Sequence, residues 1–136
     1  MPTLPLLSKG LIQSHVDTFD PHRLLEKNFP IRVLQFGEGG FLRGFADWMI
    51  HRMNSKGLFQ GKVVIIQPLP QGTVELLNQQ EGLFTLLRRG IDQGKPKEEI
   101  EIITSVSQGI NPYTDYASFL NCAALPDLRI IISNTT

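Results

Sequence analysis

The chain has 136 residues, of which 41% are hydrophobic, and its 13 basic and 13 acidic side chains cancel. This composition is typical of one globular domain with a hydrophobic core and excludes a disordered chain. A balanced charge gives no overall field to attract nucleic acid or an anionic membrane surface, so we expect neither partner. No apolar run approaches the roughly 20 residues that span a bilayer. The N-terminus lacks a secretory pattern and the single Cys122 cannot form an internal disulfide, so we expect a cytoplasmic protein.

Residues 1–29 show no regular hydrophobic period and are broken by several prolines. We interpret this stretch as an N-terminal arm with one short helix near 23–27. Ser14, His15 and Asp17 have the side chains of a hydrolytic triad. Sequence neighbours rarely converge in triad geometry, so a solvated arm is the better interpretation.

Residues 31–67 have the pattern of a βαβ unit. An apolar run over 31–36 and a β-branched run over 62–67 are predicted strands, and residues 41–56 have helical spacing between them. The helix should pack Phe41 and Met49 against the sheet, and Trp48 is expected in the core as well. Because the unit has the expected size of about 30 residues, its two strands should be parallel.

The middle of the chain contains a predicted β-hairpin. Residues 83–89 and 99–106 are predicted strands, and "GIDQGK" between them has the composition of a hairpin loop. The preceding "GTVELLNQQEG" is compatible with either a short helix or a loop. We therefore expect the hairpin to be an insertion between elements of the parallel sheet.

The last segment is predicted to add a helix and a strand. Asn111 is a suitable helix cap and Pro112 a suitable first helical residue, so we expect a helix over 111–124 and a strand over 128–132. Cys122 should be a small buried helix residue. The predicted fold is an α/β, Rossmann-like parallel sheet with flanking helices and an inserted hairpin. It forms a partial domain over 30–136, because the chain stops directly after an apolar strand.

The segment "FGEGGFLR" between the first strand and the helix is the strongest functional signal. Gly37 would make a tight turn and Gly39 would let a pyrophosphate approach the backbone at the positive end of the helix. The strict dinucleotide motif has a third glycine where this chain has Leu42. The following Arg43 can meet a phosphate or a substrate carboxylate. The charge of Glu38 would repel the pyrophosphate, so its carboxylate should point away.

The second strand ends in Gln67-Pro68. A carboxylate at this position favours NAD and a nearby arginine favours NADP. Gln67 is neither, although its amide can hydrogen-bond to ribose hydroxyls. The predicted cofactor-binding residues are Phe36, Gly37, Glu38, Gly39, Gly40, Phe41, Leu42, Arg43 and Gln67.

No catalytic or metal-binding group is evident in the sequence. The three histidines, His15, His22 and His51, are far apart, and Cys122 has no partner for metal binding or nucleophilic catalysis. We assign no catalytic residue and no metal ligand to this chain.

The stretches "FGEGGFLRGFADWMI", "EGLFTLLRRG" and "LRIIISNTT" resemble the N-terminal domain of the mannitol dehydrogenase family of long-chain polyol dehydrogenases. The resemblance covers about residues 30–136, and its most specific part is the Gly-x-Gly-x-Phe-x-Arg variant that begins at Gly37. Polyol members usually carry histidine where this chain has Leu42 and Phe45. These departures favour the hexuronate branch of the family.

The resemblance implies NAD-dependent interconversion of D-altronate and D-tagaturonate, in which the substrate is a sugar acid. It also implies that a catalytic lysine, with companion asparagine and histidine residues, lies in a helical second domain. That domain is absent from this chain, so we expect the 136 residues alone to be inactive. Exposed Ile130, Ile131 and Ile132 would favour self-association.

Three alternatives are weighed against this interpretation. The chain could belong to a mannitol- or fructuronate-type polyol dehydrogenase, or it could be a nucleotide-binding module without catalysis. A P-loop phosphotransferase is disfavoured because no Gly-Lys-Ser/Thr follows the glycines.

Overall fold

A computed structural model describes residues 5–14, 25 and 27–134 of the chain. Its centre is a four-stranded sheet in the order β5 (Val106–Ile110), β2 (Lys62–Ile66), β1 (Ile31–Phe36) and β6 (Ile130–Ser133). All three strand pairs are parallel, and Leu34 of β1 pairs with Val64 on one side and Ile131 on the other. The predicted parallel pairing of the first two strands is confirmed, and β1 begins and ends at the predicted residues.

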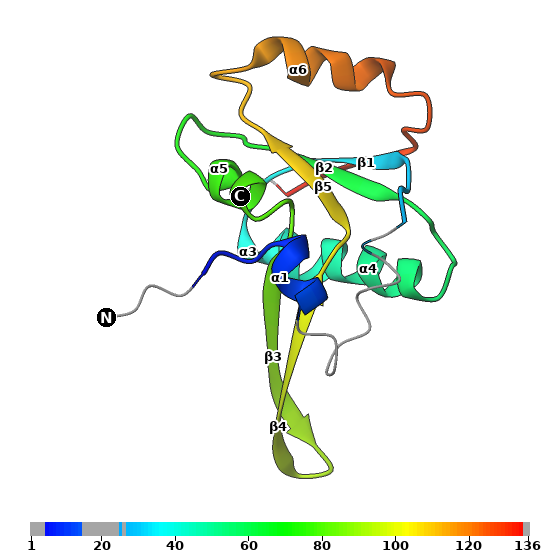
Figure 1. Cartoon of the computed structure of the whole chain (residues 1–136), viewed down its shortest axis with the longest axis vertical. Coiled ribbons are helices and arrows are strands. Elements are labelled where there is room, and N and C mark those ends of the chain that lie inside the picture. Colours follow the sequence, from blue (N-terminus) through cyan, green and yellow to red (C-terminus); the bar gives the residue numbers. More distant parts are fainter. Residues whose placement is uncertain (1–4, 15–24, 26, 135–136) are drawn as a thin grey trace.

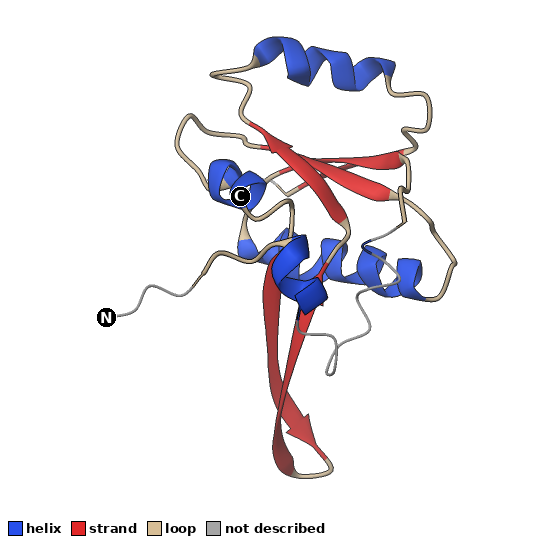
Figure 2. Ribbon diagram, in the orientation of Figure 1, coloured by secondary structure: helices blue, strands red, loops and turns tan. Residues whose placement is uncertain are grey.

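Both faces of the sheet are buried, as parallel sheets require. Val33, Val63 and Ile65 face one hydrophobic cluster, and Leu34 and Val64 face the other. Figure 2 shows α6 (Tyr116–Asn121) covering one face, while the helices that follow β1 lie on the opposite face. The continuous apolar runs in β1 and β2 therefore have a direct cause in the two-sided burial of these strands.

The helical segment after β1 is continuous but not uniform. It consists of α3 (Gly40–Leu42), a π-helical turn (Arg43–Asp47) and α4 (Trp48–Ser55). Together these match the predicted helix over 41–56. A π turn contains one extra residue per turn and is often found at functional sites.

The predicted inner face of this helix is partly wrong. Phe41 is 63% exposed and Met49 is 38% exposed, whereas Leu42 and Ile50 are buried. Two apolar stripes with four-residue spacing run along the helix. The stripe that begins at Leu42 is buried, whereas in the stripe that begins at Phe41 only Met53 packs against the core. Trp48, in contrast, is partly buried against the core, as expected.

The inserted hairpin projects from the body of the molecule (Figure 1). It pairs β3 (Phe84–Asp92) with β4 (Lys95–Ile103) in an antiparallel register. Its two turn residues, Gln93 and Gly94, both have positive φ angles, of 49° and 77°. This geometry belongs to a two-residue type I′ turn. The strands consequently run through most of the predicted "GIDQGK" loop.

The second predicted strand of the hairpin, over 99–106, is in fact parts of two strands. β4 ends at Ile103, and β5 begins at Val106 as an edge strand of the parallel sheet. The ambiguous segment before the hairpin forms α5 (Val74–Gln79), which is fixed to β5 through Asn78: its side chain donates to Gly109 O and accepts from Gly109 N.

The last helix begins later than predicted. Asp115, not Asn111, caps α6, and its carboxylate accepts a hydrogen bond from Ser118 N at 3.0 Å. Asn111 instead accepts a hydrogen bond from Tyr113 N, which forms a turn before the helix. Cys122 follows in a short 3-10 turn, Cys122–Ala124, and is buried as expected. Leu128 and Arg129 precede β6, which begins at Ile130.

The described part of the N-terminal arm contains α1 (Lys9–Ser14), which we did not predict. Its Ile12 is buried, and Lys9 N donates to the Glu81 carboxylate. The expected helix near 23–27 and the side chains of the triad candidates lie largely outside the described residues. Among the described helices, none has the length and apolar character needed to cross a membrane.

Candidate dinucleotide site

The glycine turn lies at the carboxyl end of β1, where open α/β sheets bind their ligands. Gly37 has a φ of +122°, and a Cβ on this residue would lie 3.3 Å from Leu42 Cδ1. Its N–H donates to Ile66 O at 3.0 Å, which fixes the turn beside the end of β2. Gly37 is therefore required by conformation, and Leu42 fills the space beneath the turn.

Gly39 and Gly40 serve a different purpose. Gly39 has an extended backbone (φ −66°, ψ 162°) that any residue can adopt. Both glycines are exposed, and a Cβ added to either would have no neighbouring atom within 4 Å. Side chains here would extend into the space in front of the helical run 40–55. The glycines thus leave room for a group to approach the backbone N–H groups at the positive end of this helix.

A buried polar pair supports the turn from below. Gln35 Nε2 donates to Gly37 O and to Asp47 Oδ2, each at 3.1 Å. Ser105 Oγ donates to Asp47 O at 2.7 Å. Burial raises the pKa of Asp47 to about 7, against smaller lowering effects of the Gln35 hydrogen bond and the Arg43 charge.

This support was missed in the sequence. The only available signals were single polar residues, Gln35 and Asp47, inside otherwise apolar runs. Their convergence depends on how the helix packs against β1.

Arg43 does not point toward the open space before the glycines. Its guanidinium lies 5.5 Å from the centre of the Phe84 ring, at the base of the hairpin. Its Nε is buried and has no hydrogen-bond partner among the described residues. A contact from Arg43 to a phosphate or substrate carboxylate remains a prediction.

Gln67 is buried, and its amide is occupied by the loop that follows β2. Its Nε2 donates to Leu69 O at 2.8 Å and to Pro70 O at 3.1 Å, and its Oε1 accepts from Val74 N at 3.3 Å. In this arrangement Gln67 shapes the loop rather than offering a group to a ribose.

Two hollows flank the end of β2. One, of about 500 Å³, is lined by apolar and aromatic side chains, among them Phe36, Pro68, Tyr113, Tyr116 and Phe119. The other, of about 900 Å³, is a more polar groove between α5, β5 and the start of α6. Phe36, which lines the first hollow, directly precedes the glycine turn in the chain. An apolar hollow and an open helix start thus lie at the same end of the sheet.

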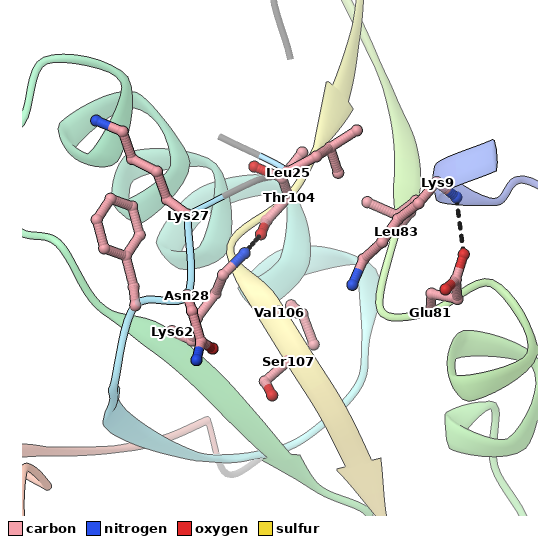
Figure 3. Close-up of a pocket in the computed structure, with 11 residues that line it drawn as sticks. Lys9, Leu25, Lys27, Asn28, Lys62, Glu81, Leu83, Thr104, Val106 and Ser107 are labelled. Atoms are coloured by element: carbon pink, nitrogen blue, oxygen red, sulfur yellow. Dashed lines mark hydrogen bonds between the residues drawn. The ribbon is translucent and has the colours of Figure 1, made fainter. Parts of the chain in front are cut away.

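A separate pocket of about 180 Å³ lies at the opposite end of the strands, where β2 and β5 begin (Figure 3). Lys62 Nζ donates to Thr104 O, and burial lowers the pKa of Lys62 to about 8. Lys9 and Lys27 also line this pocket. Because it lies at the amino ends of the strands, it is distinct from the glycine turn.

Among the described residues, His51 and Cys122 are buried and away from the glycine turn. His51 Nδ1 accepts from Thr104 N at 3.2 Å and its Nε2 faces Glu101, while burial raises the pKa of the Cys122 thiol. No group of three His, Cys, Asp or Glu side chains within the described ranges could hold a metal ion.

Together the four parallel strands, in the order three-two-one-four by their sequence, and the glycine turn after the first strand define a Rossmann-type nucleotide-binding domain. The model of the mannitol dehydrogenase Rossmann domain matches residues 31–136. The chain therefore belongs to the mannitol dehydrogenase family.

Named relatives agree with this assignment. The chain is 48% identical over 131 residues to the altronate oxidoreductase of Halalkalibacterium halodurans, covering 96% of this chain and 25% of that protein. It is 44% identical over 108 residues to the altronate oxidoreductase of Bacillus subtilis, covering 79% of this chain and 22% of the relative. The chain thus spans about a quarter of the length of the relatives it matches.

Solved structures show the same fold. The mannitol 2-dehydrogenase of Pseudomonas fluorescens, in ternary complex with NAD and D-mannitol, superposes with a TM-score of 0.74 at 16% identity, over 96% of this chain and 26% of that one. A substrate-free D-sorbitol dehydrogenase gives the same TM-score at 14% identity, over 96% of this chain and 27% of that one.

Proposed function

We propose that the chain is the NAD-binding part of a tagaturonate reductase, also called altronate oxidoreductase, which interconverts D-altronate and D-tagaturonate. The observation that carries the proposal is the open space in front of Gly39 and Gly40 at the start of the helical run 40–55. The names of the relatives support the substrate, and the NAD in the Pseudomonas fluorescens complex supports the cofactor.

The residues of this chain would bind and orient the cofactor. The backbone of Gly39 and Gly40 would contact the pyrophosphate, and the hollow beside Tyr113 and Tyr116 would hold the adenine. When bound, NAD supplies the hydride-accepting nicotinamide. Gln35 would hold the turn in place through its bonds to Gly37 and Asp47.

We further propose that this chain alone does not turn over substrate. Hydride transfer from an alcohol needs a positioned acid or base, and the buried His51 is already hydrogen-bonded within the fold. The rival interpretation, a nucleotide-binding module without catalysis, predicts the same NAD affinity. The two differ in whether a longer protein that contains this domain oxidises altronate.

Both points can be measured on one preparation. Calorimetry with NADH should show binding by the purified chain, and NADH absorbance should stay constant when tagaturonate is added. The full-length Bacillus subtilis relative serves as the positive control for the assay. No NADH binding would contradict the cofactor proposal, and turnover by a mass-verified 136-residue chain would contradict the proposed inactivity.

We also propose that the chain is cytoplasmic and that it self-associates. Ile130 and Ile131 of the edge strand β6 are 42% and 65% exposed. Exposed apolar edge strands tend to pair with other chains. Light scattering should show a concentration-dependent increase in mass, and a strictly monomeric chain would contradict it.

A further inference from the structure

The end of β2 lacks the group that ordinarily reads the adenosine ribose. Gln67 takes that position, but its amide is hydrogen-bonded to the following loop. That loop, "PLPQGT" over 68–73, contains no acidic residue and no arginine or lysine. It therefore offers neither the carboxylate that favours NAD nor a cation for the 2′-phosphate of NADP.

A carboxylate reaches this position from the glycine turn. A Cβ placed on Gly72 would collide with the side-chain amide of Gln67 and with Glu38 Oε1, so both side chains converge at the end of β2. The hydrogen bond from Gly37 N to Ile66 O keeps the glycine turn next to this strand end. The Glu38 carboxylate therefore lies beside Gln67, at the strand end where Rossmann domains ordinarily read the adenosine ribose.

The carboxylate of Glu38 is also incompletely paired. Its Oε2 is buried and has no hydrogen-bond partner, and no basic side chain of the described residues forms an ion pair with it. Buried polar atoms almost always have a partner, and an ionised carboxylate can only accept. Ribose hydroxyls are donors of the required kind. Gln71, Gly72 and Thr73 are exposed, so this part of the loop can yield to a ligand without uncovering the core.

We propose that Glu38 is the specificity-determining residue of the site: its carboxylate accepts hydrogen bonds from the adenosine ribose hydroxyls and its charge excludes the 2′-phosphate of NADP. This inference rests on the proposed binding of a dinucleotide at the glycine turn. It differs from the usual arrangement in that the acidic group comes from the first strand's turn and not from the end of the second strand.

The test compares NADH and NADPH affinities by calorimetry for the chain and for Glu38→Gln, which keeps the shape but removes the charge. A hydrogen bond to a charged group accounts for about a tenfold affinity difference. Glu38→Gln should weaken NADH binding about tenfold and strengthen NADPH binding. Glu38→Ser, which also makes room, should strengthen NADPH binding further. Thermal unfolding of each variant shows whether the fold is retained, and Glu98→Gln, on the exposed hairpin, removes the same charge far from the turn.

The outcomes separate this inference from the proposed function. If NADH binding depends on Gly39 but the NADH-to-NADPH preference is unchanged in both Glu38 variants, the role of Glu38 is wrong and the site stands. If the unmodified chain binds neither dinucleotide, both are overturned. A preference that shifts toward NADPH only in the Glu38 variants, and not in Glu98→Gln, supports the inference.

Discussion

The base of the hairpin and the glycine turn both place a glutamate in a partly enclosed position, but they differ in how completely that glutamate is paired. At the hairpin base, the Glu101 side chain is 13% exposed and contacts Trp48 Nε1 at 2.9 Å, His51 Nε2 at 3.3 Å and Arg52 at 3.3 Å. At the glycine turn, Glu38 Oε2 has no partner among the described atoms. The Glu101 carboxylate is thus paired on both oxygens within the fold, whereas the Glu38 carboxylate has one oxygen without a partner among the described residues.

The electrostatics of the hairpin base fit a structural role. His51 Nδ1 accepts a hydrogen bond from Thr104 N, so the proton of the neutral ring lies on Nε2, toward Glu101. Burial lowers the pKa of His51, with the charge of Glu101 acting in the opposite direction. A histidine held neutral and hydrogen-bonded on both nitrogens fixes the hairpin to α4. The comparison teaches that the fold itself uses the acceptors of Glu101, while Glu38 at the end of the sheet keeps an acceptor that no described residue uses.

The largest expected effect comes from breaking the paired region. Glu101→Ala should lower the free energy of unfolding by about 3 kcal/mol, because removing one member of a buried charged network leaves its partners unpaired. Urea denaturation measures this loss. Glu98→Ala, which removes an exposed partner of Arg89, is the matched control and should change stability little. NADH affinity should be the same in both variants, and a selective loss in Glu101→Ala would contradict the division into two regions.

The next effect concerns Asp47, which joins the two regions. Its pKa is raised from 3.8 to about 7 in the folded chain. Between these two pH values the Asp47 carboxyl is protonated in the folded state and ionised in the unfolded state. Stability from this group is therefore present below pH 4 and is lost as pH rises toward 7. Asp47→Asn should remove that loss and be more stable than the unmodified chain by roughly 2–4 kcal/mol at pH 8.

The pH dependence is the control for this prediction. At pH 4 the difference between Asp47→Asn and the unmodified chain should nearly vanish, because Asp47 is then protonated. His51 has a lowered pKa and destabilises the fold as pH falls below 6.5, but it does so in both proteins and cancels in the difference. A stability difference that is equal at pH 4 and pH 8 would show that Asp47 is not protonated in the folded chain.

A smaller effect distinguishes the two glycines of the turn. Gly37→Ala should cost about 1–2 kcal/mol, because the φ of +122° is strained for any other residue. Gly39→Ala should be neutral or stabilising by up to about 1 kcal/mol, because its backbone is extended and its Cβ position is open. Thermal unfolding measures both. Equal destabilisation by the two substitutions would mean that the fold itself requires a glycine at position 39, and that the residue does not serve to keep space open for a ligand.

Sequence patterns predicted the elements that local composition determines. The strand over 31–36 and the glycine turn after it were found because an apolar run meets a glycine cluster. β5 was missed because Thr104 and Ser105, which separate it from the hairpin, look like one more part of a continuous strand. These two polar residues are buried by contacts with His51 and the Asp47 backbone, and such contacts exist only after the chain has folded.

The candidate site, too, was predictable only where local sequence determines the conformation. The conformational role of Gly37 follows from the motif, but the positions of Glu38 and Gln67 do not. Whether a side chain at the end of β2 is free depends on the loop that folds back onto it, as the bonds from Gln67 to Leu69 and Pro70 show. Likewise, the sequence did not determine which face of the helix packs against the sheet, because two apolar stripes are present. Only tertiary packing shows that Leu42 is buried and Phe41 is exposed.

The most direct test of the central claim is an NADH titration of the unmodified chain and of Gly39→Val by calorimetry. The valine side chain would occupy the space in front of the helix without straining the backbone. Gly90→Val, on the exposed hairpin strand where space is also open, is the matched control. We predict that Gly39→Val retains its stability but binds NADH at least about tenfold more weakly, whereas Gly90→Val binds normally. Equal NADH affinity in Gly39→Val and the unmodified chain would contradict the assignment of the glycine turn as the dinucleotide site.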